Sequence, residues 1–155
     1  MTSVLLGVDV TSNTADALFE LGTKHRDQNA DKEYIYVLAD EAITATSAVI
    51  IPEDHGVEMV DTTSTASAFG DRVGVANTAL TSGYYGWVQI YGATTLNVAT
   101  SCAANTAINS TASAGRLDDD ASVGAEVING IVTTGAESSN AAAAILTYPT
   151  VGATL

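Results

Sequence analysis

The feature that most constrains the fold of this chain is its division into short β-branched and aromatic runs, each ended by glycine, proline or a small polar turn. Glu33–Asp40 (EYIYVLAD) alternates in polarity, and Ser47–Ile51 (SAVII) stops at Pro52, which lacks the N–H that a strand ladder needs. Only 15% of the residues are charged, whereas helices are usually rich in Glu, Lys and Arg. The pattern predicts an all-β domain, a compact antiparallel sandwich or barrel of short strands.

Turn signals divide the chain into individual strands. Thr81-Ser82-Gly83 and Asn129-Gly130 are typical hairpin turns. Gly92-Ala93 predicts a further turn, and Pro149 predicts the end of the last strand. The predicted strands are residues 33–39, 47–51, 56–60, 72–77, 85–92, 94–99, 123–128, 131–134 and 141–147.

The first thirty residues have a different pattern. Asn13 and Asp16 are able to cap a helix over Ala17–Leu21, with Gly22 as its stop. Such a helix is too short to be stable alone, so we favour an extended arm that becomes ordered against a neighbour. We therefore divide the chain into an N-terminal arm and basic segment, residues 1–32, and a β-rich domain, residues 33–155.

The charge balance excludes one class of partner. The chain has five Lys and Arg residues against 18 Asp and Glu, a formal net charge of −13. Proteins attract nucleic acid through Lys and Arg, so we expect no nucleic-acid partner. We also expect no membrane partner, because no apolar run approaches the roughly 18 residues of a membrane span, and the N-terminal residues lack the basic region of a signal peptide. The expected place of synthesis is the cytoplasm of a host cell.

No combination of residues in the sequence predicts catalysis, and we expect neither an enzyme nor a cofactor. The two histidines, His25 and His55, are interpreted as exposed loop residues, because no nucleophile motif lies near them. Cys102 is the single cysteine, without a disulfide partner and without metal-type Cys or His spacing around it. We interpret it as a small buried apolar residue.

Two acidic segments leave a choice between a solvated turn and a cation site. Residues 27–31 (DQNAD) match the opening of a calcium loop, but Lys32 and Leu38 stand where such a loop needs glycine and glutamate. Asp118–Asp120 places three carboxylates together, and their repulsion favours a bound cation. We interpret both segments as solvated turns and predict no metal site.

Two groups of residues are candidates for contacts. Tyr85, Trp87 and Tyr91 share one face of a predicted strand, which indicates a core or subunit contact or, alternatively, a platform for sugar rings. The second group is basic and lies within nine positions of the chain: Lys24, His25, Arg26 and Lys32.

The basic group has two interpretations. On so acidic a chain it is the one place that would attract an acidic partner, because the other cations, Arg72 and Arg116, are isolated in sequence. Alternatively, its side chains neutralise the neighbouring carboxylates of Asp27, Asp31 and Glu33. We favour the first interpretation and expect residues 1–32 to lie along the partner.

A resemblance to a known family rests mainly on Asp71–Gly92 (DRVGVANTALTSGYYGWVQIYG). Its Val-Gly-Val-Ala segment, small turn and Gly-Trp-Val-Gln strand resemble a pattern in small structural proteins of tailed-phage heads. Further similar segments occur in the expected order over most of the chain: Phe19–Thr23, Glu33–Val37, Ala112–Gly115 and Ile145–Pro149. The chain is therefore similar to capsid decoration, or cement, proteins.

The resemblance implies a β-rich virion protein that binds the major capsid protein on the outer capsid surface, in many copies, and stabilises the shell. Such proteins carry no catalytic residues and often form trimers around local threefold positions. We expect a homotrimer, with a dimer as second choice. The alternative is a carbohydrate- or host-receptor-binding β-domain of a phage fibre or head appendage.

Overall fold

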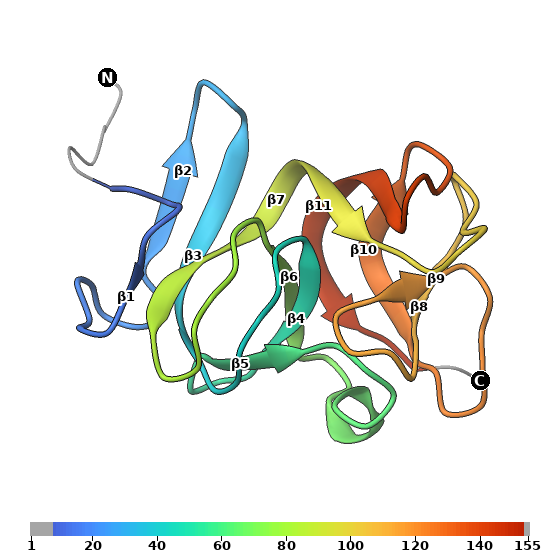
Figure 1. Ribbon diagram of the computed structural model, residues 1–155, viewed down its shortest axis with the longest axis horizontal. Helices are drawn as coiled ribbons and strands as arrows, with labels where there is room; N and C mark the ends of the chain where they lie inside the picture. Colours follow the sequence, from blue (N-terminus) through green and yellow to red (C-terminus); the bar gives the residue numbers. More distant parts are fainter. Residues whose placement is uncertain (1–7, 154–155) are drawn as a thin grey trace.

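The computed structural model of the chain describes residues 8–153, and their regular structure is almost entirely β (Figure 1). The prediction of an all-β fold is confirmed. Within the described residues no helix is long and apolar enough to cross a membrane. The elements are, in chain order, β1 (Asn13–Thr14), β2 (Lys24–Asp27), β3 (Lys32–Ala39), β4 (Ser47–Ile51), β5 (Gly56–Met59), the 3₁₀ helix η1 (Thr65–Ser67), β6 (Arg72–Ala76), β7 (Tyr85–Asn97), β8 (Ile108–Ser110), β9 (Leu117–Asp118), β10 (Val127–Thr133) and β11 (Ala141–Val151).

Five strands close a ring around the smaller of two aliphatic cores. Strand β3 pairs with β5 and β7, β4 pairs with β5 and β6, and β6 pairs with β7. These pairings are antiparallel except that of β3 with β5, which is parallel. Because alternate residues of a strand point to the same face, β3, β4, β5 and β7 send branched side chains inward, and β6 contributes Ala76. The branched side chains include Ile35, Val37, Val49, Ile51, Val88 and Ile90.

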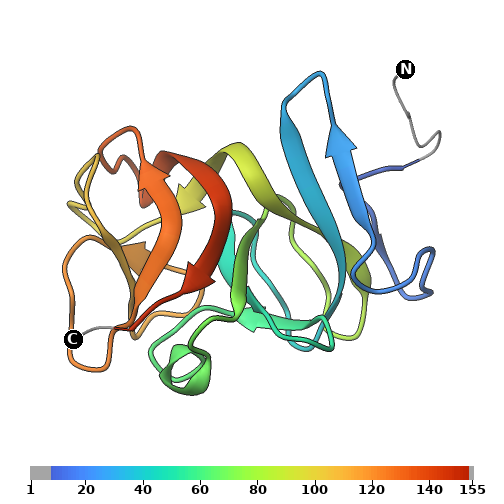
Figure 2. The ribbon, with the colours of Figure 1, turned by 180° about the vertical axis from the view of Figure 1, so that it is seen from behind.

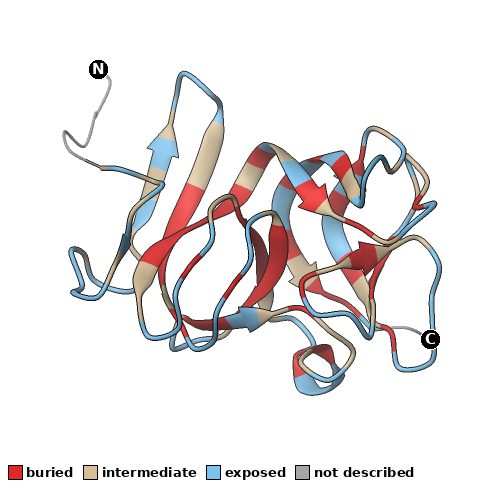
Figure 3. Ribbon diagram, viewed as in Figure 1, coloured by how far each residue is buried: buried red, intermediate tan, exposed pale blue. Residues whose placement is uncertain are grey.

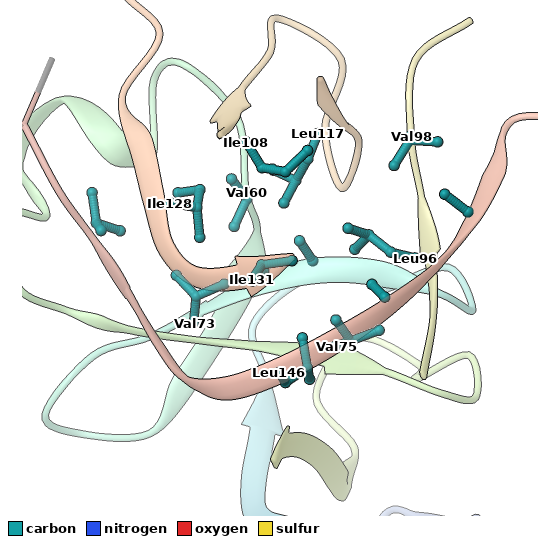
Figure 4. Packing of buried hydrophobic residues seen from close by; sticks show 14 of the residues in the cluster. Val60, Val73, Val75, Leu96, Val98, Ile108, Leu117, Ile128, Ile131 and Leu146 are labelled. Atoms are coloured by element: carbon teal, nitrogen blue, oxygen red, sulfur yellow. The ribbon is translucent and has the colours of Figure 1, made fainter. Parts of the chain in front are cut away.

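A second ring shares strand β7 with the first. Its other members are β11, β10, β8 and β9, and a bridge between Val98 and Leu117 closes it. Seen from behind, β10 and β11 lie side by side at the front of this ring (Figure 2). The ring surrounds the larger aliphatic core, where Ile108, Ile128 and Leu146 converge (Figure 4).

Strands β4 and β6 form the wall between the two cores. Ala48 and Ile50 of β4 belong to the larger core, whereas Val49 and Ile51 belong to the smaller one. A strand with apolar neighbours on both faces has no solvent side, so its sequence is one uninterrupted apolar run. All five residues of β4 are buried, and buried residues concentrate in these central strands (Figure 3).

Strand β7 continues through the turn that the sequence predicts at Gly92-Ala93. Residues 85–91 pair with β3 and residues 91–97 pair with β11, so the strand changes partner at Gly92. Gly92 has a φ of +96°, and a Cβ atom there would collide with the carbonyl oxygen of Asp31. The predicted turn is wrong, because this glycine bends one strand from the first ring into the second.

The hairpin predicted at Asn129-Gly130 is also wrong. Strand β10 runs through this pair, and its register with β11 shifts between Asn129 and Ile131, which makes the pair a bulge. A Cβ atom on Gly130 would lie 3.0 Å from the Cα of Pro149. Pro149 lies inside β11, at a position without a register partner, so its missing N–H interrupts no ladder. Residues 123–126, predicted as strand, form a turn before β10.

The described part of the predicted arm, residues 8–32, lies against the β-domain. Strand β1 pairs with β7, and β2 pairs with β3. Residues 17–21 form bends in place of the short helix that the sequence left open. Among the described residues β2 has β3 as its single strand partner, so its other edge is free (Figure 1). Residues 1–7 of the predicted arm lie outside the described residues.

Candidate partner-binding site

The aromatic strand lies against the N-terminal segment. Trp87 is 1% exposed, and its ring centroid lies 5.0 Å from that of Tyr36 and 5.3 Å from that of Phe19. Tyr85 borders the same cluster. Since the indole of Trp87 is buried, it has no exposed face on which a sugar ring could stack.

A second aromatic pair lies further along the sheet, the half-buried Tyr91 and the exposed Tyr148. Their ring centroids are 5.2 Å apart, and Tyr148 is 48% exposed. The hydroxyl of Tyr148 donates a hydrogen bond of 2.8 Å to Oε2 of Glu33. The guanidinium carbon of Arg26 lies 5.7 Å from the centroid of the Tyr91 ring. An aromatic pair and a cation thus share this face.

The four basic residues singled out in the sequence do not share one face. The His25 ring turns toward the aromatic cluster, with its centroid 6.1 Å from that of Trp87. It is half-buried in a strand, so the prediction of an exposed loop residue is wrong. Lys24 and Arg26 point to the opposite face of β2, because strand residues alternate. Lys32 lines a separate pocket.

Arg26 is neutralised by its neighbours. Its Nη1 lies 2.7 Å from Oε1 of Glu33, and its Nη2 lies 3.0 Å from Oδ1 of Asp31. The second interpretation of the basic group, neutralisation of neighbouring carboxylates, therefore applies to Arg26. Exposed ion pairs of this kind contribute little to stability, but they compensate the charge that Arg26 would offer to a partner.

Arg72, isolated in the sequence, is brought close to Lys24 by strand pairing. Arg72 begins β6 and is the register partner of Thr150 in β11, and from there it lines the same pocket as Lys24. Among residues 8–153 neither cation forms an ion pair with a carboxylate. Lys24 and Arg72 are 48 positions apart in the sequence, so no local pattern could have revealed the pair.

His55 orients the guanidinium of Arg72. The Nη2 atom of Arg72 lies 3.1 Å from Nε2 of His55. Burial lowers the pKa of His55, the Arg72 charge lowers it further, and Asp54 partly opposes both effects. The neutral imidazole can accept an N–H from Arg72. His55 is half-buried, so the prediction of an exposed residue is wrong here as well.

The calcium-like segment forms the turn between β2 and β3. The backbone N–H groups of Asn29 and Ala30 donate to Oδ1 of Asp27, at 3.0 and 3.2 Å. A carboxylate that accepts two backbone donors in this way stabilises the turn itself. The local hydrogen bonds explain the acidic opening of the segment.

Cys102 is buried beside two carboxylates. Its Sγ atom and carboxylate oxygens of Asp118 and Asp119 all lie within 4.8 Å of one another. Burial raises the pKa of the Cys102 thiol to about 11, and burial also raises the pKa of Asp118. In the absence of a metal ion the thiol is protonated at neutral pH, so Cys102 is not a thiolate nucleophile in this state. Cys102 therefore packs as a small neutral side chain.

Comparisons with known proteins identify no relative: no family model, no curated protein and no solved structure matches this chain. Its function has to be argued from the site and from the sequence pattern.

Proposed function

We propose that this chain is a non-enzymatic structural protein that binds the outer surface of a tailed-phage capsid and stabilises the shell. The observation that carries the proposal is the pair of Lys24 and Arg72, which form no ion pair with a carboxylate among residues 8–153, on a chain of net charge −13. Such a pair draws one face of an acidic protein toward an acidic partner and keeps the other faces away. The major capsid protein is the proposed partner.

The position of the phage-like pattern in the fold supports the proposal. Asp71–Gly92 contains β6, the following turn and the first half of β7. Strand β6 lies in the wall between the two cores and β7 is shared by the two rings, so a pattern that reflects a shared fold is expected in them. Closed rings also leave few free strand edges, which suits a protein that is displayed at high density.

An apolar pair on the outer face of β10 and β11 supports self-association. Val132 and Ile145 are register partners, and each is 46% exposed. We propose that a homotrimer, or as second choice a dimer, forms through this pair. Light scattering of Ile145→Lys should then show a smaller particle than the wild-type chain, both free and on the shell. An unchanged particle size would contradict this role of Ile145.

Co-sedimentation with empty capsids tests the function directly. The protein should pellet with capsids in a saturable way, and added NaCl should weaken binding because salt screens the attraction between charged faces. The alternative, a carbohydrate- or receptor-binding domain, is favoured by the contact of the half-buried Tyr91 with the exposed Tyr148. Binding to immobilised glycans without binding to capsids would decide for that alternative.

A further inference from the structure

Lys24 and Arg72 stand in a defined pocket of about 220 Å³. It lies below the roughly 300–1,000 Å³ of pockets that hold drug-sized ligands, so it fits one or two side chains of a partner. Its lining comes from four strands: Lys24 from β2, Arg72 and Val73 from β6, Ile90 from β7, and Tyr148 and Pro149 from β11.

The two cations make the pocket selective for a negative charge. Lys24 is exposed, whereas Arg72 is half-buried and held by His55. Because transferring a charge out of water is costly unless it is paired, a half-buried guanidinium favours a carboxylate as its neighbour. Arg26, in contrast, already has Asp31 and Glu33. A guanidinium binds a carboxylate through two parallel hydrogen bonds, which also fixes its orientation.

The rest of the lining is apolar. Val73, Ile90 and Pro149 are buried, and the half-exposed ring of Tyr148 forms part of the wall. The backbone of Tyr148 has a φ of +46°, an uncommon conformation for this residue type. Its ring contacts Tyr91 and its hydroxyl is bonded to Glu33, so the wall is preorganised. A carboxylate beside an apolar side chain would match this lining.

We infer that the pocket lined by β2, β6, β7 and β11 binds an Asp or Glu side chain of the capsid shell protein, next to an apolar residue. The inference rests on the proposed function and names the contact through which it operates. This contact differs from the one expected from the sequence. Arg72 joins Lys24 in the pocket, whereas Arg26 is ion-paired with carboxylates and the His25 ring faces Trp87. A second copy of this chain, which is itself acidic, is the competing occupant.

Neutralising variants test the contact. Arg72→Gln and Lys24→Gln should each weaken binding to empty capsids by about tenfold or more, because a desolvated carboxylate loses its partner. Arg72→Lys keeps the charge but loses the two parallel hydrogen bonds, so its affinity should be intermediate. The matched control is Arg116→Gln, which removes the same charge outside the pocket and should bind like wild type. Circular dichroism confirms the fold of each variant, and Lys24 is exposed enough to be replaced without disturbing the core.

Zero-length carbodiimide cross-linking identifies the occupant. The reagent converts a carboxylate into an O-acylisourea, the Lys24 amine attacks its acyl carbon and releases the urea, and the resulting amide is located by mass spectrometry. An amide between Lys24 and an Asp or Glu of the shell protein is the expected product. An amide between Lys24 and another copy of this chain would overturn the assignment of the occupant. If the wild-type chain fails to bind capsids, the proposed function fails; if wild type, Arg72→Gln and Lys24→Gln bind equally, the pocket inference alone fails.

Discussion

The two faces of the β3–β7 strand pair are built from different kinds of side chain. The inner face contributes Ile35 and Val88 to the aliphatic core of the first ring. The outer face carries Tyr36 and Trp87, which the N-terminal segment covers with Phe19. Strand pairing closes the inner core, whereas the outer cluster is closed by a segment with few strand pairings. The aliphatic cores therefore hold the scaffold, and the aromatic cluster positions the segment that leads to Lys24.

The largest expected effect is at the centre of the aromatic cluster. Trp87→Ala should lower the free energy of unfolding by about 3–5 kcal/mol, measured by urea denaturation, because a large buried side chain is replaced by a cavity. Trp87→Phe is the matched variant. The indole N–H of Trp87 has no hydrogen-bond partner among the described residues, so phenylalanine removes an unsatisfied donor and should cost much less. Equal losses from both substitutions would contradict this account of the cluster.

A smaller loss is expected at the bend that joins the two rings. Gly92→Ala should cost about 1–3 kcal/mol, because alanine is strained at the positive φ and its Cβ would meet the carbonyl oxygen of Asp31. Gly83 also has a positive φ but has open space around it, so Gly83→Ala is the control for strain alone. Thermal or urea unfolding should rank Gly92→Ala as the more damaging of the two. The reverse order would mean that the close approach at Gly92 is unimportant.

Phe19→Ala tests whether the aromatic cluster on the outer face of the β3–β7 pair can open while the aliphatic cores stay closed. Phe19 is half-buried, so we expect a loss of about 1–2 kcal/mol. Hydrogen exchange should accelerate in residues 8–23 and stay unchanged in β4 and β10, because local opening leaves the closed rings intact. Faster exchange throughout the molecule would show that the cluster and the cores unfold together.

The smallest effect concerns pH at the junction of the N-terminal segment with the first ring. The ring of His55 packs against Gly22, and burial followed by the Arg72 charge lowers its pKa. The unfolded chain, with an ordinary histidine pKa of about 6.5, binds the proton more readily. Stability from this residue is therefore fully present above about pH 6.5 and is lost as pH falls through the lower folded pKa. In His55→Gln the drop in melting temperature below pH 6.5 should be smaller; an identical pH profile would contradict this.

The sequence predicted the local elements better than their arrangement. Strands at 33–39, 47–51, 56–60 and 72–77 end within one residue of β3 to β6, because apolar runs and turn residues are local signals. Gly92 and Asn129-Gly130 were misinterpreted, since a glycine with positive φ serves a bend or a bulge as readily as a turn. The pairing of Arg72 with Thr150 joins strands that are distant in the sequence, and no short sequence pattern encodes such a contact. Arg72 and Lys24 then line one pocket together with Tyr148 and Pro149 of β11.

A reconstruction of capsids saturated with this protein tests the central claim most directly. The account predicts density on the outer capsid surface, into which the two rings fit with the Lys24–Arg72 pocket facing the shell and the pair of Val132 and Ile145 at contacts between copies. Density with the pocket facing solvent, or capsids that remain bare at saturating protein, would contradict it.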